Sequence, residues 1–428
     1  MRSPWRLNVA LFVSGQTMSL FGSMVVQYAV MWWVTLQTRS GLAMALYVVA
    51  AFAPQGVVAL FGGVLADRVD RRALVMAADG GIALATLVLA LLMANGVDDL
   101  WIVLLAVAVR SVGAGVQTPA VRAMIPQIVP GEHLMRVNGI FHTIQSAMAL
   151  LAPAAAGAIF AVFGIVPLFF LDVVTALIGI ALLGRVSVPA LRRAAEARST
   201  YRQDLVEGMR HLRTHRIVRW LLSVYAITFL LTVAPSYVTP LMVARTFGTD
   251  EWLLTVLELA FSSGMLLGGV LMSTVLAKRG RIGLIMVATY GFGAVTVAMG
   301  LSTNVWVFYG FMFAFGLLAP LLAAPFTTLI QERVEPGMQG RVFSYVSIVS
   351  ALATPASMVV FGPLADVVSV QTLLIAAGLT TVAVMAIATR LPDGRATVAA
   401  TRSATSPASS TSQPVLGDGA LPRKGSTK

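Results

Sequence analysis

Residues 63–72 read GVLADRVDRR, and this charged stretch separates two long apolar runs. The first run begins at about residue 43, and the second continues to about residue 95. A glycine near the end of an apolar helix allows close approach to a neighbouring helix, and clustered arginines favour the cytoplasmic face of a membrane. The stretch therefore predicts two membrane-spanning helices joined by a tight basic loop.

The composition of the whole chain extends this prediction. Of its 428 residues, 58% are hydrophobic and 11% are charged, whereas a typical soluble domain carries about 25% charged residues. These values exclude a soluble enzyme and a largely disordered chain. The apolar runs are continuous and lack the alternation of a β-barrel, so we expect an all-α membrane protein. Twelve transmembrane spans are predicted, at about 8–36, 43–64, 73–95, 101–125, 137–163, 167–185, 219–240, 252–276, 282–302, 306–330, 342–364 and 370–390.

The basic residues predict the orientation. With the N-terminus in the cytoplasm, 27 of the 30 lysines and arginines lie in cytoplasmic segments. Arg39 and Arg245 then lie outside, and Arg110 lies within a span. This asymmetry predicts a multi-pass protein of the plasma membrane with both termini in the cytoplasm. It also explains the net charge of +12 by topology and by attraction to anionic lipid on the cytoplasmic side, without a nucleic-acid partner.

Three sequence features recur at a single offset of 206 residues and indicate a duplication. They are GGVL at 62–65 and 268–271, Pro119 and Pro325, and Pro-Gly at 130–131 and 336–337. We therefore expect two pseudo-symmetric six-helix halves, residues 1–185 and 219–390, around a central cavity. Residues 186–218 are expected to form a cytoplasmic linker with an interfacial helix, and residues 391–428 a disordered cytoplasmic tail. We expect the protein to act as a monomer.

The loop at 63–72 resembles the signature loop of the major facilitator superfamily, glycine-x-x-x-aspartate-x-x-glycine-arginine-arginine. Gly63, Asp67, Arg71 and Arg72 match this pattern, while Asp70 replaces its second glycine. The resemblance implies a cytoplasmic gate at Asp67, which would cap the start of span 11 near Arg341. The alternative is that the arginines of this loop act only as topology signals.

Two further motifs resemble the same superfamily. Arg110 lies inside span 4 and shares a helix face with Gln117, similar to the family's span-4 motif, in which a membrane arginine is tied to proton coupling. The alternative is a structural arginine paired with a buried acid. In span 5, Pro153 and Gly157 belong to a stretch similar to the antiporter motif, which predicts a kink and close helix contact beside the cavity.

Acidic residues inside the spans are few. Asp79 in span 3, Asp172 in span 6 and Glu258 in span 8 are the candidates for carrying a coupled proton. Such a role needs a carboxylate whose pKa is raised by apolar surroundings and which both sides reach in turn. The alternatives are that Asp172 pairs near the interface and that Asp79 belongs to the charge network of the 63–72 loop.

Polar stripes on the central spans predict a cavity for an amphiphilic molecule. The candidate lining residues are Gln16, Ser23, Gln27, Gln117, Thr228 and Thr232. Tyr28, Trp32 and Trp33 are instead expected in an aromatic belt at the membrane interface.

Taken together, these features predict a secondary transporter that exports an amphiphilic compound, such as a drug, a macrolide or a siderophore-like molecule, in exchange for protons. Residues 204–210 and the GPLAD stretch at 362–366 resemble the macrolide-efflux and enterobactin-exporter branch of the superfamily. An importer or uniporter of the same fold is one alternative, and a non-transporting receptor is another. No phosphate-binding loop, metal-ligand spacing or catalytic triad is visible, so we expect neither an enzyme nor a metal or other cofactor.

Overall fold

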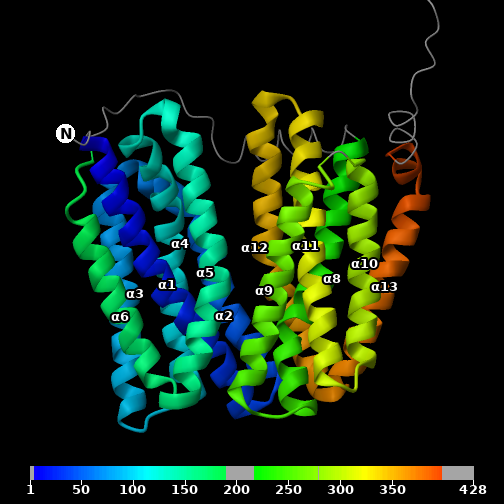
Figure 1. Ribbon diagram of the computed structural model, residues 1–428, viewed down its shortest axis with the longest axis horizontal. Coiled ribbons are helices and arrows are strands. Elements are labelled where there is room, and N and C mark those ends of the chain that lie inside the picture. Colours follow the sequence, from blue (N-terminus) through cyan, green and yellow to red (C-terminus); the bar gives the residue numbers. More distant parts are fainter. Residues whose placement is uncertain (1–3, 189–215, 278, 398–428) are drawn as a thin grey trace, which may run out of the picture.

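The computed structural model describes residues 4–188, 216–277 and 279–397, and for residues 60–68, 234, 336, 337, 340, 341 and 344 it describes the backbone alone. Twelve of its helices are long and apolar enough to cross a membrane, as predicted (Figure 1). They are α1 (Pro4–Thr38), α2 (Gly41–Arg68), α3 (Arg71–Ala94), α4 (Leu100–Ile128), α5 (Leu134–Phe163), α6 (Val166–Leu183), α8 (Arg216–Thr246), α9 (Glu251–Ser273), α10 (Arg281–Leu301), α11 (Val305–Arg333), α12 (Pro336–Val367) and α13 (Val370–Arg390). A short 3-10 helix, η1 (Gly131–His133), precedes α5.

The helices form two bundles with the same internal packing, which confirms the two six-helix halves expected from the repeat (Figure 1). In the first half, α2 packs on α4, α3 on α4 and α6, and α1 on α5 and α6. In the second half, α9 packs on α11, α10 on α11 and α13, and α8 on α12 and α13. These contacts correspond one to one when each helix of the first half is matched to its counterpart in the second.

The two halves meet mainly through two helix pairs, α2 against α12 and α5 against α9, and α8 makes smaller contacts with α1 and α2. We call the end of the bundle that holds Pro4 and Arg390 the terminal end, and the end that holds the α1–α2, α8–α9 and α12–α13 turns the distal end (Figure 1). Among the described residues, most hydrogen bonds between the halves lie at the distal end. One further bond joins α9 to α5, where the Ser262 hydroxyl donates to the Ala149 carbonyl at 3.0 Å.

Two features differ from the predictions. Residues 392–397, expected in a disordered tail, are helical, and Asp393 there forms an ion pair with Arg219 of α8. Trp32 and Trp33, expected in the interfacial belt, are 0% and 7% exposed, because α1 is packed between helices of both halves. The linker helix predicted before residue 216 and the tail after residue 397 lie outside the described residues.

Close backbone contact holds α9 against α11. A Cβ atom added to Gly316 of α11 would lie 2.1 Å from the Phe261 carbonyl oxygen of α9. A Cβ atom on Gly310, two turns earlier on α11, would meet nothing within 4 Å. Of these two glycines, only Gly316 is therefore required by the packing of α9 against α11.

We predict that Gly316→Ala lowers the free energy of unfolding by about 1–3 kcal/mol, because the added methyl group forces two helix backbones apart. Gly310→Ala is the matched control on the same helix and is expected to be neutral or slightly stabilising, since alanine favours helix. Thermal unfolding of the purified protein in detergent measures both changes. Equal midpoints for the two variants would contradict the packing described here.

Candidate functional site

A buried ion pair lies in the middle of the first half. Arg110 of α4 pairs with Asp172 of α6, whose carboxylate is fully buried while the arginine is 12% exposed. Thr86 of α3 donates to Asp172 Oδ2 at 2.9 Å, and Ser23 of α1 donates to Oδ1 at 3.3 Å. Arg110 also donates to the Thr86 hydroxyl. Four helices thus converge on one carboxylate, and these hydrogen bonds offset part of the cost of burying its charge.

A second carboxylate, Asp79, lies on α3 seven residues before Thr86, about two helical turns nearer the terminal end. Ser19 of α1 donates to its Oδ1 at 2.9 Å, and Gln117 of α4 donates to the same oxygen. Its other oxygen, Oδ2, is buried without a hydrogen-bond partner among the described residues, as is Nε2 of Gln16. Among the described residues, the hydrogen-bond partners of Asp79 belong to α1 and α4, and not to the charged loop before α3.

Cavities run along α1 between these groups. One of about 320 Å³ is lined by Ser23, Gln27, Arg110 and Gln117 together with apolar residues of α2 and α4. A smaller one of about 90 Å³ continues toward the terminal end, where Gln16 and Gln145 line it. The predicted polar stripe of α1 therefore faces open space inside the bundle.

A third cavity, of about 280 Å³, lies between the two halves. Tyr28 and Met31 of α1 face Ser236 and Tyr237 of α8, Glu258 and Phe261 of α9, and Met312 of α11 across it. It adjoins the larger cavity at Met24 and Gln27, which line both. The combined space is apolar and aromatic with a few polar groups, which suits an amphiphilic molecule.

Glu258 differs from the other two carboxylates. It forms no hydrogen bond or ion pair with any residue that the structure describes, although it is half-buried in the cavity between the halves. A carboxylate in apolar surroundings is costly unless a proton or a cation balances its charge. Glu258 is therefore the acidic group most directly available to something that enters the cavity.

Two predicted cavity residues lie elsewhere. Thr228 lines a separate groove of about 540 Å³ between α8 and α13, bordered by Arg219 and Asp393. Thr232 is buried, and its hydroxyl donates to the Thr228 carbonyl of its own helix at 2.8 Å. The threonine stripe of α8 is turned away from the central cavity, and α8 contributes Ser236 and Tyr237 instead.

The charged loop of residues 63–72 is described in part. At Gly63, Asp67 and Arg341 the structure describes only the backbone, so the expected gate stays a prediction. Arg71 donates to the Ala123 carbonyl of α4 at 2.9 Å, and Arg72 donates to the carbonyls of Gly184 and Val186 after α6. These two arginines join the start of α3 to the ends of α4 and α6, which is a structural role in addition to any effect on topology.

Pro153 and Gly157 lie on the contact between the halves. Both are buried within α5, and a Cβ atom on Gly157 would lie 1.9 Å from the Thr255 hydroxyl of α9. The small residues of this stretch therefore let α5 and α9 approach closely, as the motif predicts.

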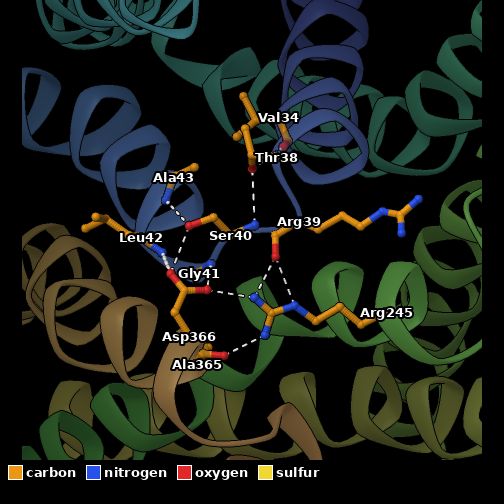
Figure 2. Close-up of polar contacts among 10 residues, drawn as sticks. All are labelled: Val34, Thr38, Arg39, Ser40, Gly41, Leu42, Ala43, Arg245, Ala365 and Asp366. Atoms are coloured by element: carbon orange, nitrogen blue, oxygen red, sulfur yellow. Dashed lines mark hydrogen bonds and ion pairs between the residues drawn. The ribbon is translucent and has the colours of Figure 1, made fainter.

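Sequence reasoning missed a cluster at the distal end. Asp366 of α12 contacts the first residues of α2, and Arg245 of α8 joins the same cluster (Figure 2). The available signal was the GPLAD stretch at 362–366, which repeats the pattern of GVLAD at 63–67.

Comparisons with known proteins agree with this fold. The sequence profile of the Major Facilitator Superfamily matches residues 9–358. Macrolide efflux protein A of Streptococcus pyogenes is 28% identical over 370 residues, covering 86% of this chain and 91% of that protein. Macrolide efflux protein A of Enterococcus faecalis is 29% identical over 306 residues, covering 70% and 95%. A solved bacterial homologue of the iron transporter ferroportin, in an inward-facing state, is similar in fold with a TM-score of 0.68 at 18% identity, covering 91% and 100%.

We predict that Arg110→Met lowers the free energy of unfolding by about 3–5 kcal/mol, because it leaves Asp172 as a buried carboxylate without its cation. The double variant with Asp172→Asn removes both charges and should recover most of this loss. Denaturant unfolding in detergent provides the comparison. A double variant no more stable than Arg110→Met would show that charge balance is not what the pair contributes.

Proposed function

The chain belongs to the major facilitator superfamily, and we propose that it exports an amphiphilic small molecule in exchange for protons. Membership makes it a multi-pass membrane transporter and not an enzyme. The proposal adds the direction of transport, the coupling ion and the class of substrate.

The cavity around Glu258 is the observation that carries the proposal. It is bordered by both halves, so a molecule bound there contacts α1 on one side and α8, α9 and α11 on the other. Relative movement of the halves would open this cavity first to one end of the bundle and then to the other, as alternating access requires. Aromatic rings and methionines supply adaptable apolar contacts, and one carboxylate supplies charge.

Export is favoured by the similarity to efflux proteins, and the charge distribution orients the bundle in the membrane. The excess of basic residues at the terminal end supports a cytoplasmic location for that end, so the distal contacts would close the cavity on the outer side. In an exporter this inward-facing state receives substrate from the cytoplasm, and importers and uniporters pass through the same state. Two relatives that match most of their own length are named macrolide efflux proteins, which supports a bulky amphiphilic substrate.

Glu258 is proposed as the group that exchanges a proton for substrate. Its carboxylate has no ionic partner among the described residues, so a proton or a cationic part of the substrate would balance its charge. Both cannot occupy one carboxylate together, and this competition couples the two movements. Arg110 lines the cavity of about 320 Å³, and its pairing with Asp172 is proposed to change during the cycle.

We predict that Glu258→Gln reduces proton-driven accumulation of a fluorescent amphiphile in energised inverted vesicles by at least about tenfold, because the exchangeable charge is lost. Glu251→Gln is the matched control, since it makes the same change at the first residue of the same helix and away from the cavity. It should transport at close to the unsubstituted rate.

A protonophore added to the same vesicles should abolish accumulation by the unsubstituted protein. Accumulation that survives the protonophore would overturn proton coupling. Uptake that runs only in right-side-out vesicles would instead indicate an importer, and equilibration without concentration would indicate a uniporter.

A further inference from the structure

Asp366, near the end of α12, binds the beginning of α2 (Figure 2). Its Oδ1 accepts from the Gly41 N–H at 2.7 Å, and its Oδ2 accepts from the Leu42 N–H at 2.8 Å and the Ser40 hydroxyl at 2.8 Å. Gly41 and Leu42 are the first two residues of α2, whose N–H groups have no acceptor within their own helix. A carboxylate here satisfies both groups and meets the positive end of the helix dipole. Asp366 therefore caps a helix of the other half.

Arg245, in the last turn of α8, adds a second connection between the halves. It pairs with Asp366 at 2.7 Å and donates to the Ala365 carbonyl at 2.5 Å. It also donates through Nε to the Arg39 carbonyl in the α1–α2 turn at 2.9 Å. Arg39 has φ of 47°, a left-handed backbone conformation that residues other than glycine rarely adopt. In this turn the carbonyl of Arg39 points toward Arg245 (Figure 2). The Arg39 side chain points away from the cluster.

The two backbones touch at the same place. A Cβ atom on Gly41 would lie 2.1 Å from the Gly362 carbonyl oxygen, and one on Gly362 would lie 2.6 Å from the Gly41 carbonyl oxygen. The start of α2 and the end of α12 can therefore approach closely enough for a short aspartate side chain to reach the free N–H groups.

The sequence provides such a carboxylate at the α2–α12 contact but not at the equivalent α5–α9 contact. The offset of 206 that relates the halves pairs Asp366 with Phe160, so the equivalent α5–α9 contact carries no such carboxylate. Within the α2–α12 pair, however, both helices end in G-x-L-A-D, at 63–67 and 362–366, and they run in opposite directions. The two motifs thus occupy opposite ends of the bundle.

We propose that Ser40, Gly41, Leu42, Arg245 and Asp366 form a distal latch that holds this end of the cavity closed, and that capping of α2 by Asp366 is its main contact. Helix capping changes an equilibrium by roughly 2- to 30-fold. An ion pair between partly exposed groups, such as Arg245 and Asp366 at 29% and 32% exposure, changes it by roughly 1- to 5-fold. The latch opens when the halves rock apart, so it rests on the proposed alternating access but on no particular substrate.

The test measures access to the cavity from the distal side. The chain contains no cysteine, so Met31→Cys supplies a single thiol in the cavity between the halves. A membrane-impermeant maleimide is applied to right-side-out and inverted vesicles, and the labelling rate is followed. Asp366→Ala in this background is expected to raise distal labelling about 5- to 30-fold, because the closed state loses its cap.

Asp366→Asn separates capping from ion pairing. Asparagine keeps one acceptor oxygen for the α2 N–H groups but loses the charge that pairs with Arg245. We expect an increase of less than about 5-fold, since asparagine also caps helices well. An increase equal to that of Asp366→Ala would overturn capping as the main contact.

Arg39→Asn is the control for charge at this end. Asparagine tolerates the left-handed conformation, and the latch uses only the backbone carbonyl of residue 39. Its labelling rate should equal that of the Met31→Cys background. An unchanged rate in Asp366→Ala would overturn the latch, whatever the outcome of the efflux assay.

A second reporter, Gln145→Cys, distinguishes a shift between states from general loosening. Gln145 lines the cavity nearest the terminal end, so its labelling from that side should fall when the distal end opens. A rise at both reporters in Asp366→Ala would mean that the substitution loosens the fold, and this would also overturn the proposal.

Discussion

The constraint on which the structure depends is that polar groups within the membrane must find partners inside the bundle, because lipid offers none. Arg110 and Asp172 satisfy each other, with Thr86 and Ser23 completing the carboxylate's hydrogen bonds. Asp79 is held by Ser19 and Gln117. Glu258 lacks such a partner among the described residues, and it lies where the two halves face each other. Glu258 and the interface between the halves thus coincide, which is the arrangement that the proposed coupled transport needs.

Close glycine contacts occur within the halves and also between them, at Gly157 and at Gly41 and Gly362, but the packing within each half is more extensive. Within each half, glycines such as Gly316 bring helix backbones into contact along apolar faces. Between the halves, contact is concentrated in the α2–α12 and α5–α9 pairs, with smaller contacts of α8 against α1 and α2, and the described hydrogen bonds gather toward the distal end. A few polar contacts cost less to exchange than a packed core does, so each half can move as a body while the interface rearranges.

The sequence predicted the fold well because apolar run length, basic asymmetry and the 206-residue repeat are local or periodic signals. It placed Arg110 and Asp172 in different spans but could not pair them, because the rotation of α4 and α6 about their axes is set by packing. Trp32, Trp33 and Thr232 were misplaced for a related reason. Because α1 and α8 are central helices, their apolar pattern does not show which side faces lipid and which faces protein. Asp366 was visible in a repeated motif, but two of its partners at the start of α2 are backbone N–H groups, which no sequence pattern marks, and the third is the hydroxyl of Ser40.

The central claim is that the two halves rock about the cavity, so that one end opens as the other closes. The most direct measurement is the distance between spin labels on single cysteine pairs in lipid: Asp98 with Thr303 at the distal end, and Met135 with Arg333 at the terminal end. Raising the pH from acidic to alkaline is expected to change the two distances in opposite directions. Distances that stay fixed, or that change together, would contradict alternating access by this protein.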